Sequence, residues 1–428
     1  LLTIGQIKDL ESKGFMFKDK YLDISKLTAN PHIFNLFKVV EKHGGVLRFV
    51  GGSVRDAIAG MKGFDLDLAT DLSPDELVEA CEESGLKTIP IGIKFGTVGV
   101  VIDNQVLEVT SLRKDIKTDG RHAEVVFTSD WNEDASRRDL TINAVYADEK
   151  GNVFDYYNGV DDLEKGIVRF IGSAGQRIKE DYLRILRFFR FYSIFGKAPI
   201  DTKALEACKE NKDGLKQLSM ERIRDELFKL FLTPKVIETL QIMYDNEILS
   251  YILPDTHYLE ELDFLVNTIN TGDLPNAPLR RLFVLYNPDE ALAENLATRL
   301  RMSNKQREDF VSWARFHPFF DEFLEEKPLR RLVYLHGNDF CRDKLILLSA
   351  FNRRVLPDIR ERIKHIAQIK LPEFSIKGRD VIAAGIKDNR KIGEVLDELE
   401  QIWIDSDFNL SHEELLQRLP ELILSLIH

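Results

Sequence analysis

The residues 51–55, with the sequence GGSVR, combine two glycines, a hydroxyl and a guanidinium directly after the apolar run VLRFV. That run predicts a buried strand. Gly51 and Gly52 would let the backbone turn tightly and approach a ligand closely, because neither carries a Cβ. We expect Ser53 to cap the following helix, whose free N–H groups can bind phosphate oxygens. Arg55 adds a fork-shaped cation, so the stretch is suited to a polyphosphate.

Two carboxylates, Asp65 and Asp67, follow in the next apolar run, FDLDLAT. In a strand, residues two apart share a face, so both carboxylates would point the same way. A divalent cation would relieve their repulsion, and Mg²⁺ prefers hard oxygen ligands together with substrate phosphates. Glu108, in the later run QVLEVTSL, is a third candidate that could complete the metal site or accept a proton from an attacking hydroxyl. An ion pair between Glu108 and Arg113 or Lys114 is the structural alternative.

The segment RRDLTINA, residues 137–144, is a second dense cluster of polar groups. The adjacent arginines, the second of which is Arg138, are suited to bidentate contacts with phosphate oxygens. Asp139 and Asn143 are four residues apart, so on a helix they would share a face, where either could bind a ribose hydroxyl. A surface cluster of ion pairs would explain the two arginines and the aspartate equally well.

The segment EDYLRILRFFR carries Asp181, Arg184, Arg187 and Arg190 at intervals of three, which predicts one polar ridge on an otherwise apolar helix. A carboxylate beside a guanidinium can imitate a Watson–Crick edge. Asp181 would accept from the amino group of cytosine or adenine while Arg184 donates to the ring, whereas uracil and guanine present the opposite pattern. Each mismatched buried group would cost about 1–3 kcal/mol. An ordinary helix with an Asp–Arg pair is the alternative.

The bulk properties indicate a soluble protein of several packed parts. The chain has 428 residues, a formal net charge of −12, and no apolar run near the roughly 20 residues that a membrane span needs. The three isolated cysteines predict buried thiols rather than a disulfide framework, so we expect a cytoplasmic location. The negative charge argues against a general nucleic-acid coat but permits local basic faces, such as 353–370. The chain begins with Leu1 rather than Met, so we expect the natural N-terminus to lie upstream.

The pattern of apolar residues divides the chain into a mixed head and a helical remainder. Residues 1–45 have helical spacing, and 46–175 contain short strand-like runs, including a hairpin predicted at Asp103-Asn104. The polar, glycine-containing segment 112–126 predicts a mobile loop beside the metal site. After residue 175 only helical periodicity remains.

The motifs GGSVRD, DLD, EVTSLR, RRDLTINA, DYYNG and EDYLRILRFFR occur in this order within residues 30–235. In this combination the chain resembles the class II tRNA nucleotidyltransferase (CCA-adding enzyme) and bacterial poly(A) polymerase family, whose head belongs to the DNA polymerase β superfamily. The later segment MERIRDE is similar to the family's last neck motif, and LPEFSIKGRDVIAAGI with KIGEVLDELEQIW resembles its C-terminal segment.

The resemblance implies an α+β fold: a head of 1–175 with a mixed five-stranded sheet, a helical neck of 176–235 that selects the nucleotide, and a helical body and tail of 236–428 that bind tRNA. It implies addition of C, C and A to the tRNA 3′ end from CTP and ATP, with two Mg²⁺ ions, no membrane and no obligatory protein partner. The residues implied as metal ligands are Asp65 and Asp67, with Glu108 as an additional catalytic candidate. The residues expected to bind nucleotide are Gly51, Gly52, Ser53, Arg55, Arg138, Asp139, Asn143, Asp181, Arg184, Arg187 and Arg190.

Several alternatives stay open at this point. Within the same chemistry the chain could add only CC, add only A, or synthesise poly(A), although its acidic C-terminal region argues against the last and the presence of 112–126 against the first. A small-molecule nucleotidyltransferase would explain GGS and DLD but not the later motifs. A catalytically silent RNA-binding protein is disfavoured by the intact Asp65 and Asp67.

Overall fold

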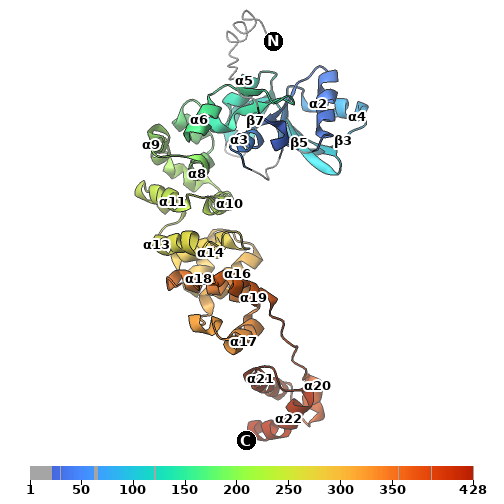
Figure 1. The fold of residues 1–428 in the computed structure, drawn as a ribbon, viewed down its shortest axis with the longest axis vertical. Helices are drawn as coiled ribbons and strands as arrows, with labels where there is room; N and C mark the ends of the chain where they lie inside the picture. The colour runs from blue at the N-terminus through green and yellow to red at the C-terminus, as the bar shows by residue number, and fades with distance from the viewer. Residues whose placement is uncertain are drawn as a thin grey trace, which may run out of the picture. The chain divides into compact units, whose positions relative to one another are not determined.

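The computed structural model describes residues 22–28, 30–61, 66–119, 122–354, 356–386 and 388–427. The chain divides into two compact units, one ending at Asp255 and the other beginning at Thr256. In Figure 1 the sheets belong to the first unit, and the elements drawn for the second unit are all helices. Asp65, one of the two predicted metal ligands, lies outside the described residues.

The main sheet of the first unit has seven strands in the order β3-β4-β5-β2-β1-β8-β9. The strands are β1 (Leu47–Val50), β2 (Asp67–Thr70), β3 (Lys87–Gly92), β4 (Thr97–Ile102), β5 (Gln105–Ser111), β8 (Val145–Ala147) and β9 (Val153–Asp155). β2 and β5 are parallel and the other neighbours antiparallel, so the predicted mixed sheet is confirmed. The expected number of five strands was too low, because β3 contains a proline, which only an edge strand tolerates, and β8 and β9 are too short to show a period.

The turn between β4 and β5 confirms the predicted hairpin. Asp103 and Asn104 both have positive φ, 50° and 63°, as a two-residue turn matched to the strand twist requires. The side chains of β5 then alternate as expected: Leu107 and Val109 are buried, whereas Glu108 is exposed. Glu108 therefore lies on the sheet face opposite the core.

The segment predicted as a loop forms a β-hairpin instead. β6 (Arg113–Asp119) and β7 (His122–Phe127) pair as a separate two-stranded sheet. The polar sequence of β6 gives no strand signal, because strand pairing uses backbone groups that every residue type except proline offers in full. The apolar run EVVFT, which overlaps β7, does predict a strand.

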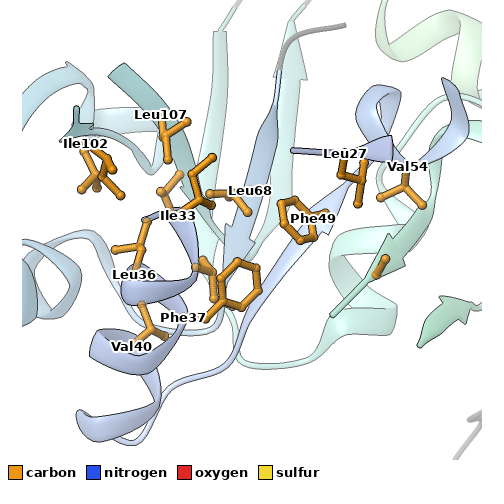
Figure 2. Packing of buried hydrophobic residues seen from close by; sticks show 14 of the residues in the cluster. Leu27, Ile33, Leu36, Phe37, Val40, Phe49, Val54, Leu68, Ile102 and Leu107 are labelled. Carbon is orange, nitrogen blue, oxygen red and sulfur yellow. The ribbon is translucent and has the colours of Figure 1, made fainter. Parts of the chain in front are cut away.

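One face of the main sheet is covered by α2 (Ile33–Lys42) and α4 (Pro74–Glu83). Phe37 of α2 packs against Phe49 of β1 with 5.1 Å between ring centroids, and Figure 2 shows Leu36 and Val40 beside Phe37 on the same helix. The N-terminus of α4 is fixed by Ser73, which forms a capping box with Glu76. The other face is covered by the helix at Trp131–Ser136 over β1, β2 and β8, whereas Val106 and Glu108 of β5 are exposed on it.

Helices occupy the rest of the first unit after the strands, as the sequence predicts (Figure 1). The described α-helices of this unit not yet named are α3 (Gly52–Ile58), α5 (Trp131–Ser136), α6 (Gly159–Lys165), α7 (Ala174–Glu180), α8 (Leu183–Phe195), α9 (Thr202–Glu210), α10 (Met220–Phe231), α11 (Val236–Asp245) and α12 (Leu249–Ile252). The single helix expected across residues 180–190 is interrupted at Asp181, which is extended (φ −156°, ψ 108°) and accepts a hydrogen bond from the Leu183 N–H. A short acidic side chain competes with the helix in this way because it bonds nearby backbone groups.

The regular elements that the structure describes in the second unit are all helices. Its α-helices are α13 (Leu259–Asp263), α14 (Ala277–Tyr286), α15 (Glu290–Arg299), α16 (Asn304–Arg315), α17 (Glu326–His336), α18 (Asn338–Phe351), α19 (Ile359–Gln368), α20 (Gly378–Ala383), α21 (Asn389–Asp405) and α22 (His412–Ile427). Within the basic stretch 353–370, Arg353 pairs with Glu260 and Glu261, Arg354 with Asp321, and Arg360 with Asp273. Several cations of this stretch are therefore already paired with acidic side chains of the same unit, as on an ordinary solvated helix face. None of the described helices combines the length and the apolar composition that crossing a membrane would require.

Candidate functional site

A pocket of about 730 Å³ in the first unit contains most of the residues that the sequence singled out. Its lining residues are Gly51, Gly52, Arg55, Asp67, Arg137, Arg138, Asp139, Asn143, Asp181, Leu183, Arg184, Arg187, Arg190, Phe191, Arg222 and Lys229. Eight of these sixteen are Arg or Lys and three are Asp. Such an excess of positive charge in a concave site is suited to a polyanion the size of a nucleoside triphosphate.

The first wall of the pocket is the turn between β1 and α3. Gly51 has φ 65° and ψ −120°, a conformation open in practice to glycine alone, and a Cβ there would lie 3.1 Å from Nη1 of Arg138. Ser53 does not cap α3 as expected, because the helix already begins at Gly52. The Ser53 hydroxyl instead donates to the Val50 carbonyl at 3.0 Å and is buried. Ser53 therefore secures the turn and does not line the pocket.

Arg55 lies at the base of the pocket and is largely buried. Its guanidinium donates to the carboxylate of Asp56 and to Oδ1 of Asn143, and it lies 4.8 Å from the ring centroid of Phe191. Desolvation lowers the pKa of Arg55, which nevertheless stays far above neutrality in any protein. Arg55 thus presents a fixed positive charge from the middle of α3.

The two adjacent arginines of the second motif are held by one buried acid. Asp134, with 1% of its side chain exposed, binds Arg137 at 2.7 Å and Arg138 at 3.1 Å, and it accepts a hydrogen bond from the Tyr146 hydroxyl at 2.8 Å. Burial alone would raise the pKa of Asp134, but the charges of Arg138 and Arg137 outweigh burial and lower this pKa to about 2. The network orients Arg138 toward the Gly51 turn.

Asp139 and Asn143 do not share a helix as predicted, because α5 ends before them and only a short 3₁₀ turn covers Asn143. They meet nonetheless: Nδ2 of Asn143 donates to Oδ1 of Asp139 at 3.0 Å. Nε of Arg187, from α8, donates to Oδ2 of the same carboxylate at 2.6 Å. Attraction to Asp139 raises the pKa of Arg187, so the pair is fully ionised at neutral pH.

The residues proposed to read the base also line the pocket, and each has a different partner. Oδ2 of Asp181 accepts from Arg222 of α10 at 2.7 Å. Arg184 donates to the carboxylate of Glu180 and to the Arg177 carbonyl. Asp181 and Arg184 therefore both line the pocket without being paired with one another in the contacts that the structure shows.

Arg190, the last member of the predicted ridge, donates to Glu226 of α10. Its guanidinium also lies 4.1 Å from the ring centroid of Phe191, which is the same ring that Arg55 contacts. Glu226 is 5% exposed at its side chain, so the pair ties α8 to α10 inside the unit.

Asp67 borders the pocket at its boundary with the open face of the sheet. β2 and β5 are in register so that Asp67 is opposite Glu108, and both residues are exposed. Oδ2 of Asp67 lies 4.0 Å from the position that a Cβ on Gly52 would take. Two hard carboxylates side by side at the mouth of a cationic pocket fit a divalent cation. Among the described residues, which exclude Asp65, no group of three or more His, Cys, Asp or Glu side chains could hold a metal ion.

Five lining residues were not assigned individually from the sequence: Arg137, Leu183, Phe191, Arg222 and Lys229. Arg222 and Lys229 are seven residues apart on α10, with Glu226 between them, so a helical period over MERIRDELFK would have placed them on one face. The missing information was which helix that face contacts, and the structure shows it to be α8.

Two family models match parts of this chain. Residues 47–169 match the family model described as the poly A polymerase head domain, and residues 199–259 match the probable RNA and SrmB-binding site of polymerase A. The human mitochondrial CCA tRNA nucleotidyltransferase 1 is 34% identical over 405 residues, covering 89% of this chain and 88% of the human protein. The CCA-adding enzyme of Staphylococcus haemolyticus is 30% identical over 386 residues, covering 86% and 92%.

The chain belongs to the CCA-adding enzyme family. It is a nucleotidyltransferase, and the family predicted from the motifs is confirmed. Its fold is that of the Bacillus stearothermophilus CCA-adding enzyme crystallised with CTP, with a TM-score of 0.75 at 23% identity over 91% of this chain and 96% of that one. Enzymes of this kind generally use a divalent metal, which the carboxylates at the pocket mouth would accommodate.

Proposed function

We propose that this protein adds C, C and A in turn to the 3′ end of tRNA, using CTP and ATP and no nucleic-acid template. The observation that carries the proposal is the position of Asp181 and Arg184 in the same pocket as Arg55, Arg138 and Asp67. A pair able to recognise a base edge, a group of cations and a catalytic carboxylate are the three parts that such a reaction requires. The curated relatives, which are tRNA nucleotidyltransferases, support the same choice.

In the proposed reaction the 3′-oxygen of the RNA forms a bond to the α-phosphorus and the bond to the leaving pyrophosphate breaks. Arg55 and Arg138 bind the β- and γ-phosphates, beside the glycine turn that lets the backbone approach them. Asp67, with Asp65, would hold two Mg²⁺ ions, which supply charge neutralisation at the α-phosphate and the leaving group. Glu108, opposite Asp67 in the sheet, accepts the proton of the attacking hydroxyl.

Nucleotide selection is proposed to depend on Asp181 and Arg184. Asp181 accepts from the exocyclic amino group of cytosine or adenine, and Arg184 donates to the ring positions that are acceptors in both bases. Uracil and guanine would leave these groups unpaired, at about 1–3 kcal/mol per group. Asp139 and Asn143, which contact each other, would bind the ribose, since Asn143 also accepts from Arg55 and Asp139 from Arg187.

The first experiment supplies labelled CTP and ATP, separately and together, to tRNA lacking its last three nucleotides, with Mg²⁺ present. We expect two additions from CTP alone and a third from ATP after them. Addition of CC only, of A only, or of long adenosine tails would assign the protein to a sister activity that uses the same pocket. Absence of any incorporation would contradict the proposal.

A second experiment tests the metal site. Asp67→Asn should lower kcat by about 10³-fold, because neutralising this ligand removes one of the groups that hold the ions at the reacting phosphate. Asp103→Asn, the same charge change at the turn of the β4–β5 hairpin, is the matched control and should leave kcat unchanged. Equal activity of wild type and Asp67→Asn across Mg²⁺ concentrations would overturn the assignment.

The remaining assignments extend this proposal to the whole chain. We infer that residues up to 175 are the catalytic head, that 176–235 are the nucleotide-selecting neck, and that 236–428 bind tRNA. We also infer a cytoplasmic protein that acts without an obligatory protein partner. Subcellular fractionation and activity of the purified chain alone test these two statements.

A further inference from the structure

The open face of the main sheet carries an exposed apolar surface beside the catalytic carboxylates. Ile91 of β3 and Val106 of β5 are 46% and 48% exposed. Both lie over Gly99 of β4, where an added Cβ would be 2.7 Å from Cδ1 of Ile91 and 2.9 Å from Cγ1 of Val106. The glycine thus lets the two side chains close over the strand between them and form one continuous apolar patch, here called the Ile91–Val106 patch.

Strand register places this patch directly beside the site. Gly99 is opposite Glu108, and Glu108 is in turn opposite Asp67, so the three positions form one row across β4, β5 and β2. Val106 is two residues from Glu108 on the same strand and shares its face. The Ile91–Val106 patch is therefore adjacent to Glu108, one of the two carboxylates in this row.

The order of strands indicates which of the two reactants, the nucleoside triphosphate or the RNA 3′ end, lies beside the Ile91–Val106 patch. The triphosphate pocket is lined from β2, from the turn after β1 and from the helices beyond, and Glu108 and the Ile91–Val106 patch lie on the other side of Asp67. In-line displacement requires the attacking oxygen to approach the α-phosphorus opposite the leaving pyrophosphate. With the pyrophosphate held at the glycine turn, the attacking hydroxyl must arrive from the β5–β4–β3 side.

We propose that the Ile91–Val106 patch is the surface on which the terminal nucleoside of the growing RNA rests while its 3′-hydroxyl attacks. The proposal depends on the nucleotidyl transfer assigned above and adds a primer site to it. The terminal nucleoside differs at each step, because each addition creates a new end. Apolar contact with a base face and a sugar tolerates every base, whereas hydrogen bonds to base edges would not. Continuity with Glu108 favours this occupant over a protein partner.

Photocrosslinking locates the RNA end directly. Val106→Cys would be labelled with a benzophenone maleimide, which is selective because the described native cysteines, Cys81, Cys208 and Cys341, are buried. Val46→Cys is the matched control. Val46 is 42% exposed and lies just before β1 begins, at the end of that strand away from the Gly51 turn. With tRNA lacking its last three nucleotides, we expect crosslinks from position 106 to the terminal nucleotides and none from position 46. Crosslinks from position 106 only to the RNA stem, or equal crosslinks from both positions, would overturn the proposal.

Kinetics provide the second readout on the full chain. Val106→Ser and Ile91→Ser should each raise KM for the RNA about fivefold and leave the Kd for CTP unchanged, whichever nucleotide ends the primer. Val46→Ser should match wild type in both. Unchanged KM in the two patch variants, or a loss of CTP binding along with RNA binding, would contradict the primer site. A wild-type protein that adds no nucleotide would instead refute the proposed function, so the two failures are distinguishable.

Discussion

Nη2 of Arg222 lies 2.7 Å from Oδ2 of Asp181, and this ion pair joins α10 to the turn between α7 and α8. The two residues are 41 positions apart, and their side chains are 18% and 20% exposed. The carboxylate proposed to read the base therefore has a guanidinium partner before any nucleotide enters. Arg222 fixes the direction of one carboxylate oxygen, and Asp181 retains its acceptor capacity for an incoming amino group.

Substitution of Arg222 tests whether this orientation matters. Arg222→Ala should lower the preference for CTP over UTP about tenfold, because Asp181 would lose the group that holds its oxygens in place. Arg222→Lys should restore part of the preference, since an ammonium keeps the charge but not the fork. Lys216→Ala, a cation with 66% of its side chain exposed, serves as the control. A purely structural role would instead lower stability and leave the ratio of kcat/KM values unchanged.

Arg184 should carry the discrimination itself. Arg184→Ala removes the donor to the base ring, so misincorporation of UTP and GTP relative to CTP and ATP should rise about 10- to 100-fold. The control is Lys179→Ala, an exposed cation of α7. Single-nucleotide incorporation with each of the four triphosphates measures the effect. Full discrimination in the Arg184→Ala variant would show that the base is read elsewhere.

Alanine substitutions at Gly51 and Gly44 distinguish the effect of backbone strain from the effect of moving a pocket side chain. Both have positive φ, 65° and 80°, but a Cβ on Gly51 would lie 3.1 Å from Nη1 of Arg138, whereas one on Gly44 has nothing within 4 Å. Each alanine substitution should lower the free energy of unfolding by about 1–3 kcal/mol through strain. Gly51→Ala alone should also weaken CTP binding, measured by equilibrium dialysis, because Arg138 must move. Equal CTP affinity in the two variants would count against Arg138 as a phosphate ligand.

The low pKa of Asp134 predicts that acid lowers the stability of the first unit. This pKa falls from 3.8 to about 2 on folding, so the stabilisation is complete above pH 3.8 and is lost as the pH falls toward 2. Asp134→Asn should be less stable than wild type by about 2 kcal/mol at pH 7, and the difference should shrink between pH 4 and pH 2. Urea unfolding at several pH values measures it. A difference that stays constant below pH 4 would exclude Asp134 as the titrating group.

Local sequence patterns were sufficient for the family, the mixed sheet and the helical remainder. The turn at Asp103-Asn104 and the capping box at Ser73 were predictable because each depends on residues close together in the chain. The prediction failed where pairing uses backbone groups without a side-chain signal, as in β6, and where an acid interrupts a helix, as at Asp181.

The sequence by itself determined which residue types are available: the glycine turn, the Asp-x-Asp pair, the adjacent arginines and the ridge that begins at Asp181. Only the tertiary structure decided their partners, because ion pairs such as Arg187–Asp139 and Arg222–Asp181 join residues 48 and 41 positions apart. The register that places Glu108 opposite Asp67, and the Ile91–Val106 patch beyond it, likewise depends on strand pairing. Long-range pairing reflects the packing of the whole unit, which no single stretch of sequence encodes.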